Sequence, residues 1–238
     1  MIIQLTDSSS ISLLLQNTLT RVQTLGSVYS SPKLISYIEH TLAHDVFRYY
    51  GIKKGNIVVA LIQFSETSDE IHLNNIVVDS NFRGLGLAKG LLDFLLEKAN
   101  YAEKCLSLNV LESNLPATRL YNKLGFKVEG VKVEYLVNLR GEKVISKALN
   151  FDRPDLLDEF GFSEADLINF GESRAHYRFF FVEPDIVKLL ERDTFSFLDL
   201  KLADKLYSGT IIMPYSVNSL PVLDSTIRRT IRMKYNGI

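Results

Sequence analysis

The chain has very little cysteine. Cys105 is the only one among 238 residues. A single cysteine excludes an internal disulfide, and it excludes a metal site built from several thiolates. Cys105 stands at the start of a strand-like segment, where a free cysteine more often serves as a small buried hydrophobe than as a nucleophile.

Long apolar runs and an excess of charge are also lacking. The net charge is −1 and the pI is near 6.4, so there is no electrostatic footprint for nucleic acid. No apolar run is long enough for a signal peptide or a membrane span. With 46% hydrophobic residues, the chain has enough apolar surface for one large or two modest domains. We therefore expect a globular, cytoplasmic protein with neither nucleic-acid nor membrane partners.

A glycine-rich turn between a strand and a helix is the most informative segment. Residues 71–78 are rich in β-branched and aliphatic side chains, which favours a strand, and apolar residues then recur at helical spacing: Leu87, Leu91, Leu92, Leu95, Leu96 and Ala99. Between them lies Arg83-Gly-Leu-Gly-Leu-Ala88. Its small residues allow close backbone approach, and the first helical turn directs free N–H groups and a positive dipole end at an anion.

Spacing separates three kinds of phosphate-binding turn. A Walker-type loop needs Gly-Lys-Ser/Thr, but here Lys89 follows Ala88 and precedes Gly90. A dinucleotide fingerprint needs a third glycine three residues after Gly86, where Lys89 stands. The remaining pattern, Arg83-x-x-Gly86-x-Ala88, resembles the pyrophosphate loop of the GNAT superfamily of N-acetyltransferases.

A second segment carries the same resemblance. A strand-like run at 106–111 leads into Asn114-x-x-Ala117-x-x-x-Tyr121-x-x-x-Gly125-Phe126, which resembles the other diagnostic GNAT element. Asn114 suits a helix N-cap, and Gly125 suits the left-handed residue that ends a helix. Ala117 and Tyr121 share the apolar face of that helix. The two motifs place the resemblance over about residues 1–150.

The resemblance implies an α/β fold with a mixed, mostly antiparallel sheet flanked by helices. The residues agree with this, because they predict a strand at 2–5, helices at about 8–22 and 31–43, and a hairpin of strands at 47–53 and 57–65. Further strands are predicted at 70–79, 127–139 and 144–151. The implied activity is acyl-CoA-dependent N-acyl transfer, most simply from acetyl-CoA to an amine by direct attack in a ternary complex.

The resemblance also assigns residues to the coenzyme. The pantetheine arm would pair with the strand before the turn, the pyrophosphate would lie on the turn, and Asn114 would contact the ligand or only cap its helix. The resulting cofactor-binding set is Ile76, Val77, Val78, Arg83, Gly84, Leu85, Gly86, Leu87, Ala88, Lys89, Asn114 and Tyr121.

The catalytic candidates each have a structural alternative. Tyr121 matches the family's general acid to the thiolate, although an aromatic residue on that face also suits a core. His72 occupies a strand position where the family often has a glutamate base, and it could equally be a histidine packed on the sheet. Glu112 is the competing base, and Glu70 is a more distant option. His40 and His44 have helical spacing for a metal, but no third ligand accompanies them, so no metal is expected.

The acceptor amine is not encoded in a readable motif. A small-molecule amine is our preferred acceptor, and a protein amine is second. A homodimer is left open. The alternative from another class is a non-catalytic acyl-CoA-binding or sensory module, which thiol release from acetyl-CoA across an amine panel would distinguish.

Residues 151–238 resemble no family that we recognise, and they predict a smaller αβ addition. An acidic stretch at 152–166 is expected to form the solvated face of short helices. Strands are predicted at 176–182 and 210–213, and helices at 184–192 and 225–235. Because CoA chemistry does not need this part, a chain ending near Asn150 is expected to keep acetyl-CoA affinity if it remains soluble, and to lose most acceptor-dependent turnover through a raised KM.

Overall fold

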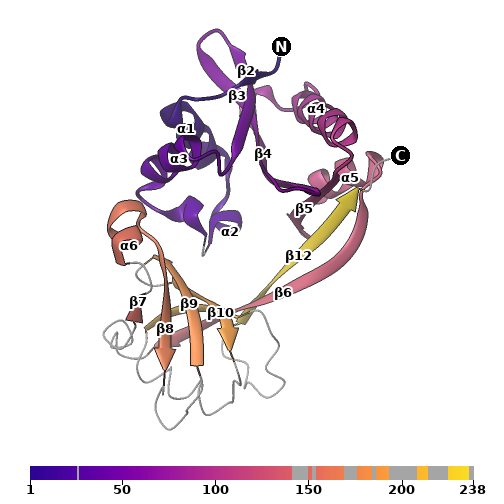
Figure 1. The fold of residues 1–238 in the computed structure, drawn as a ribbon. Helices are drawn as coiled ribbons and strands as arrows, with labels where there is room; N and C mark the ends of the chain where they lie inside the picture. Colours follow the sequence, from indigo (N-terminus) through magenta and orange to yellow (C-terminus); the bar gives the residue numbers. More distant parts are fainter. Residues whose placement is uncertain are drawn as a thin grey trace. The chain divides into compact units, whose positions relative to one another are not determined.

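The computed structural model describes residues 1–25, 27–140, 150–151, 154–168, 176–183, 186–192, 208–213 and 225–235. It divides into two compact units, which we describe separately (Figure 1). Unit 1 comprises Met1–Gln23, Ile35–Val131 and Thr230–Ile238, and unit 2 comprises Thr24–Leu34 and Lys132–Arg229. The domain boundary predicted near residue 150 lies within unit 2, and it stays a prediction.

The sheet of unit 1 is mixed and mostly antiparallel, as predicted. Its strand order is β1-β2-β3-β4-β5-β12-β6, with only the residues of β12 and β6 that belong to this unit. The bounds are β1 (Ile3–Gln4), β2 (Arg48–Lys54), β3 (Ile57–Glu66), β4 (Glu70–Val78), β5 (Cys105–Leu111), β12 (Ser225–Tyr235) and β6 (Lys127–Arg140). β4 and β5 pair in parallel, whereas β1 to β4 pair antiparallel with their neighbours and β5 pairs antiparallel with β12.

Helices flank this sheet on both faces (Figure 1). They are α1 (Ser8–Thr18), α2 (Arg21–Thr24), α3 (Leu34–Ala43), α4 (Leu87–Tyr101) and α5 (Leu115–Lys123), with a 3-10 turn η2 (Ser80–Phe82) before α4. The 3-10 turn η1 (Val28–Ser30) belongs to unit 2. The periodic leucines of α4, Leu91, Leu92 and Leu95, are fully buried in one core with Phe64 and Phe126. The helix predicted to run to residue 22 ends instead at Thr18, because Leu19 has extended backbone angles.

Strand β4 is distorted where its pairing with β5 stops. The β3–β4 ladder pairs Gln63 with Asn75 and Phe64 with Leu73, so Asn74 is an extra, bulged residue. The parallel β4–β5 ladder extends only to Leu73 and Leu108. Because a bulge bends a strand and increases its twist, the bulge at Asn74 accounts for the separation of β4 from β5 beyond this point.

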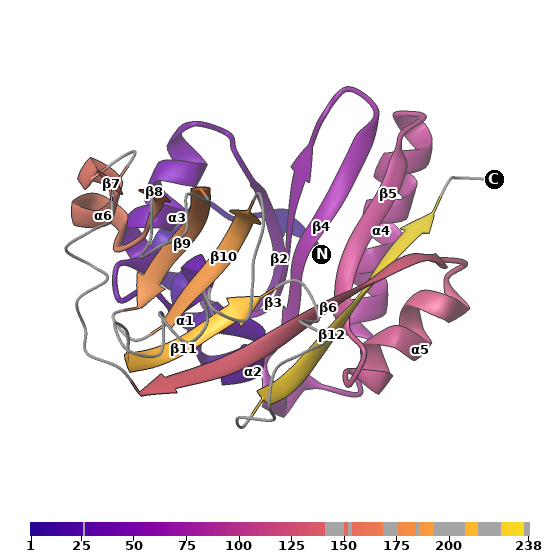
Figure 2. The ribbon, with the colours of Figure 1, turned by 90° about the horizontal axis from the view of Figure 1, so that it is seen from below.

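The predicted helix at 225–235 is wrong, because these residues form β12. Residues 230–235 pair antiparallel with Leu111 to Leu106 of β5, and the yellow end of β12 lies beside β5 in Figure 2. Met233 is fully buried in the core that α4 covers. The spacing of Ile227 and Ile231 fits a helix, but Ile231, Met233 and Tyr235 alternate as a strand requires. The pairing of these residues with β5, more than 100 residues away in the sequence, makes them a strand and not a helix.

Unit 2 is built mainly of strands. They are the remaining part of β6 with β7 (Asn150–Phe151), β8 (Ser163–Ile168), β9 (His176–Glu183), β10 (Ile186–Arg192) and β11 (Ser208–Met213), and its helix is α6 (Pro154–Phe160). The strands predicted at 176–182 and 210–213 are confirmed. The helix predicted at 184–192 is wrong, since β10 pairs with β9 and β11. The acidic stretch forms one short helix and then enters β8, and residues 144–149 lie outside the described ranges.

Unit 2 repeats the topology of unit 1. Strands β7 to β10 pair antiparallel in order, β10 and β11 pair in parallel, and β11 pairs antiparallel with β6. Strands β1 to β5 followed by β12 show the same succession of directions. The sequence shows no internal repeat, so the repeat is one of topology. In chain order, β6 follows the five strands of unit 1 and β12 follows the five strands of unit 2. These two sixth strands are exchanged, because β12 pairs with β5 and β6 pairs with β11.

Candidate functional site

A cavity of about 820 Å³ lies within unit 1 where β4 and β5 separate. Its walls come from the end of β4, the glycine turn, the start of α4, the end of β5, α5, and the connection between α1 and α2. The lining residues are Thr18, Leu19, Thr20, Val22, Gln23, Ile76, Val77, Val78, Phe82, Arg83, Gly84, Gly86, Leu87, Ala88, Lys89, Leu111, Ser113, Asn114, Pro116, Ala117, Leu120 and Tyr121. Two segments distant in sequence, the turn and the Tyr121 helix, thus meet at one cavity.

The glycine turn has the backbone that only glycine adopts easily. Gly84 and Gly86 have φ of +77° and +74°, in the left-handed region, and Gly86 is the N-cap of α4. A Cβ on either glycine would meet nothing within 4 Å. The backbone ladder of α4 begins with Gly90 N–H donating to Gly86 O at 3.0 Å, so the N–H groups of residues 87–89 precede it. This arrangement fits a phosphate group.

Two cations stand at the turn, and each has a contact of its own. Arg83 Nε donates to Val78 O at 3.2 Å, which ties the turn to the end of β4. Lys89 Nζ donates to Asp93 Oδ2 at 2.7 Å, one helical turn along α4. Both side chains are exposed and line the cavity. They provide positive charge beside the free backbone N–H groups.

Tyr121 and Asn114 enter the cavity from α5. Tyr121 is 5% exposed and its ring packs against Phe126 with the centroids 5.7 Å apart. Burial raises the pKa of the Tyr121 phenol to about 12, so this hydroxyl stays protonated at neutral pH. Asn114 Oδ1 accepts from Ala117 N–H at 3.4 Å, which makes Asn114 the N-cap of α5 as well as a lining residue.

Three predicted site residues do not line this cavity: Leu85, His72 and Glu112. Leu85 is 64% exposed at the tip of the turn, and Glu112 is exposed just after β5. His72 is half-buried on β4, where its Nδ1 lies 2.7 Å from Ser107 Oγ. Burial, and to a smaller extent the charge of Arg232, lower the pKa of His72, while Glu70 opposes this shift. A neutral imidazole is therefore favoured near pH 7.

No sequence motif marks the lining residues between α1 and α2. Thr18, Leu19 and Thr20 lie where the first helix stops, a break that neither glycine nor proline marks. The β-branched threonines were the only available signal, and helix propensities are too similar for them to be decisive. Phe82 in η2 was missed as well, since an aromatic residue before a glycine turn carries no specific meaning.

The described parts of the chain contain neither a candidate metal centre nor a candidate membrane-spanning helix. No group of three or more His, Cys, Asp or Glu side chains there is placed to hold a metal ion. His40 and His44 stack with their ring centroids 4.2 Å apart. None of the described helices combines the length and the apolar composition that crossing a bilayer requires.

The sheet of unit 1 is open and mostly antiparallel, with a parallel β4–β5 pair. A glycine turn follows β4, and α4 begins at the end of that turn. These features together define an acetyltransferase fold of the GNAT type. The sequence profile of the Acetyltransferase (GNAT) family matches residues 16–126. Residues 16–126 therefore match a GNAT acetyltransferase domain, as the two motifs predicted.

Similar proteins support this assignment. N-acetylaspartate synthetase of Rattus norvegicus is 30% identical over 126 residues, covering 46% of this chain and 42% of that protein. Spermine/spermidine N(1)-acetyltransferase of Bacillus subtilis (strain 168) is 32% identical over 81 residues, covering 33% of this chain and 50% of that protein. The matched region thus spans half or less of these relatives.

The solved structures with this fold include one that is similar over the whole chain. It is a tandem GNAT protein from the clavulanic acid biosynthesis pathway, solved without AcCoA, with a TM-score of 0.64. The likeness covers 100% of this chain and 99% of that one at 8% identity, so it concerns the fold alone. A tandem fold agrees with the repeated topology of units 1 and 2.

Proposed function

We propose that unit 1 transfers an acetyl group from acetyl-CoA to the amine of a small molecule. The observation that carries this proposal is the cavity that joins the glycine turn, the N-terminus of α4 and Tyr121. The pyrophosphate would bind the N–H groups of residues 86–89 and the charges of Arg83 and Lys89. The pantetheine arm would extend along Ile76 to Val78, where β4 has no partner in β5.

The transfer requires the amine and the thioester to be held together with an acid, Tyr121, and a base, His72. The amine nitrogen attacks the thioester carbon, the C–S bond breaks, and the thiolate leaves as the N–C bond forms. Tyr121 would donate a hydrogen bond and then its proton to the sulfur, and His72 would take the proton that the amine loses. Holding both substrates together removes the need for an acyl-enzyme, so no nucleophilic side chain is required.

The names of the similar proteins favour a small acceptor. One is a synthetase of N-acetylaspartate and the other acts on spermine or spermidine. The near-neutral net charge of this chain favours no particular peptide or nucleic-acid surface. Thiol release from acetyl-CoA, measured with a panel of amino acids, polyamines, amino sugars and peptides, tests the proposal. If the protein binds acetyl-CoA but turns over none of the amines, the sensory alternative would be favoured.

Replacing Tyr121 with phenylalanine tests its role as the acid. The ring packing against Phe126 is kept and only the hydroxyl is lost, so we expect kcat to fall by about 10²-fold with unchanged acetyl-CoA affinity. Tyr235→Phe is the matched control, because Tyr235 packs on the same Phe126 ring at 5.7 Å and does not line the cavity. A wild-type kcat in Tyr121→Phe would make Tyr121 a core residue only.

The pH profile tests His72. Because its folded-state pKa lies below the usual 6.5, kcat/KM should fall only as the pH drops below that value and protonates the imidazole. His72→Ala should remove this acidic limb, and Glu112→Gln should leave it in place. The reverse result would assign the base to Glu112. The measurement is kcat/KM between pH 5 and pH 9 with a saturating second substrate.

A further inference from the structure

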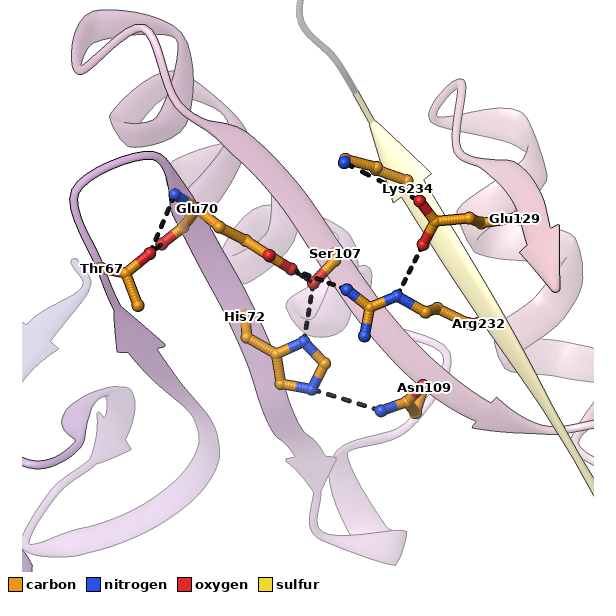
Figure 3. A network of polar contacts seen from close by, with 8 residues as sticks. All are labelled: Thr67, Glu70, His72, Ser107, Asn109, Glu129, Arg232 and Lys234. Atoms are coloured by element: carbon orange, nitrogen blue, oxygen red, sulfur yellow. Dashed lines mark hydrogen bonds and ion pairs between the residues drawn. The ribbon is translucent and has the colours of Figure 1, made fainter. Parts of the chain in front are cut away.

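A chain of polar contacts links His72 to the C-terminal strand (Figure 3). His72 on β4 and Ser107 on β5 are direct partners in the parallel ladder, and His72 Nδ1 lies 2.7 Å from Ser107 Oγ. Ser107 is fully buried, and its hydroxyl also contacts Glu70 Oε1. On the other side of the ring, Asn109 Nδ2 lies 3.4 Å from His72 Nε2.

The number of protons that these polar groups can donate determines the tautomer of His72. A carboxylate only accepts hydrogen bonds, and a serine hydroxyl has one proton to donate. Ser107 therefore gives its proton to Glu70, and its oxygen must accept a hydrogen from Nδ1 of His72. The neutral ring then carries its proton on Nδ1 and an unshared electron pair on Nε2, to which the amide of Asn109 can donate.

Glu70 is itself held by the exchanged strand β12. Arg232 Nη2 lies 3.1 Å from Glu70 Oε1, and Arg232 Nε donates to Glu129 Oε2 at 2.6 Å. Lys234 lies 3.8 Å from Glu129. The charged groups near His72 are thus Glu70, which is linked to it through Ser107, and Arg232, Glu129 and Lys234 beyond Glu70. Arg232 Nη2 contacts the same Oε1 of Glu70 that accepts from Ser107, and this ion pair holds the carboxylate beside Ser107.

We propose that Glu70 is a positioning residue that acts through Ser107 to hold His72 in the Nδ1–H tautomer, so that Nε2 is the ring nitrogen that can accept a proton. This inference rests on the proposed function for its catalytic meaning, but the tautomer itself does not depend on it. In the transfer, the amine proton would move to Nε2. The resulting imidazolium would keep its Nδ1–H bond to Ser107 and would be stabilised by the Glu70 carboxylate.

The tautomer can be read without any substrate. Long-range ¹H–¹⁵N correlation spectra of the full-length protein distinguish Nδ1–H from Nε2–H in each histidine, and His72→Ala assigns the signals of His72. We expect Nδ1–H in the wild type. In Glu70→Met the acceptor is lost, so Ser107 should donate to Nδ1 and the ring should change to Nε2–H. Ser107→Ala, which removes the acceptor of Nδ1–H, should favour the same change.

Glu66→Met is the matched control. Like Glu70, Glu66 is a partly buried carboxylate in an ion pair, and its partners are Lys104 at 2.9 Å and Lys98 at 3.7 Å rather than Arg232. We expect this variant to keep the Nδ1–H tautomer. Melting curves of all three variants show whether each is folded, and the tautomer is compared only among folded proteins.

Activity gives a second, independent readout. We expect Glu70→Met to lower kcat by about 10²-fold with an unchanged KM for acetyl-CoA, which is the size of a lost general base. An Nε2–H tautomer in the wild type, or an unchanged tautomer in folded Glu70→Met and Ser107→Ala, would overturn the proposal. A wild type that shows the expected tautomer but acetylates no amine would contradict the proposed function and leave the positioning of His72 by Glu70 intact.

Discussion

Deleting every residue after Asn150 is expected to leave a chain that does not fold. This differs from the expectation that the first 150 residues suffice for acetyl-CoA binding. The deletion removes β12, whose residues 230–235 pair with β5. It also removes Met233 from the buried core and Tyr235 from its contact with Phe126. Truncating one buried methionine costs about 2–5 kcal/mol, and a whole strand costs more than a total stability of about 5–15 kcal/mol allows.

The measurement is the soluble fraction together with a thermal melt of the purified chain. A chain that ends at Tyr235 is the matched control, since it keeps all of β12 and should melt like the full-length protein. Adding a peptide of residues 225–235 to the shorter chain during refolding should restore some soluble, cooperative material. A soluble 1–150 chain with a wild-type melting temperature would show that β12 is dispensable for unit 1.

Gly86→Val is expected to abolish the stabilisation of the protein by acetyl-CoA. At 100 times its Kd, a ligand that binds only the folded state stabilises it by about 2.7 kcal/mol, which a thermal melt detects as a higher Tm. The valine side chain would occupy the open space beside the N–H groups of α4, where we place the pyrophosphate. We therefore expect no acetyl-CoA-dependent rise in Tm.

The control must separate ligand binding from backbone strain. Gly86 has φ of +74°, so any side chain there is strained, and the variant itself should melt at a lower temperature. Gly55→Val carries a comparable strain at φ of +60°, also in open space, at the β2–β3 turn outside the cavity. It should lose stability similarly and keep the full acetyl-CoA response. A folded Gly86→Val with wild-type affinity would remove the pyrophosphate assignment.

Sequence patterns predicted the part of the fold that local rules determine. The glycine turn, the helix α4 and the Asn114 cap of α5 follow from positive φ angles, helical periodicity and capping. Strands β10 and β12 were predicted as helices because Ile186–Arg192 and Ser225–Tyr235 place apolar residues at spacings that suit both structures. Pairing with other strands determines that both segments are strands, and a local sequence pattern does not contain that information.

The candidate site shows the same division. The family motifs indicated the turn and Tyr121, both of which line the cavity. The contact between Glu70 and Arg232 was not predictable, because it depends on β12 lying beside β5. The break after Thr18, which brings the α1–α2 connection to the cavity, has no local marker either. Geometry that arises from long-range pairing was missed, and geometry that arises from a short motif was found.

The exchange of sixth strands also determines when unit 1 is completed during synthesis. Strand β5 is made early, but its partner β12 is synthesised more than 100 residues later. At about 5–20 residues per second, the edge of β5 remains uncovered for roughly 5–20 s after translation of β5 and α5. An unpaired edge is a site for wrong pairing, and chaperone demand should therefore be greatest in the interval between the synthesis of β5 and that of β12.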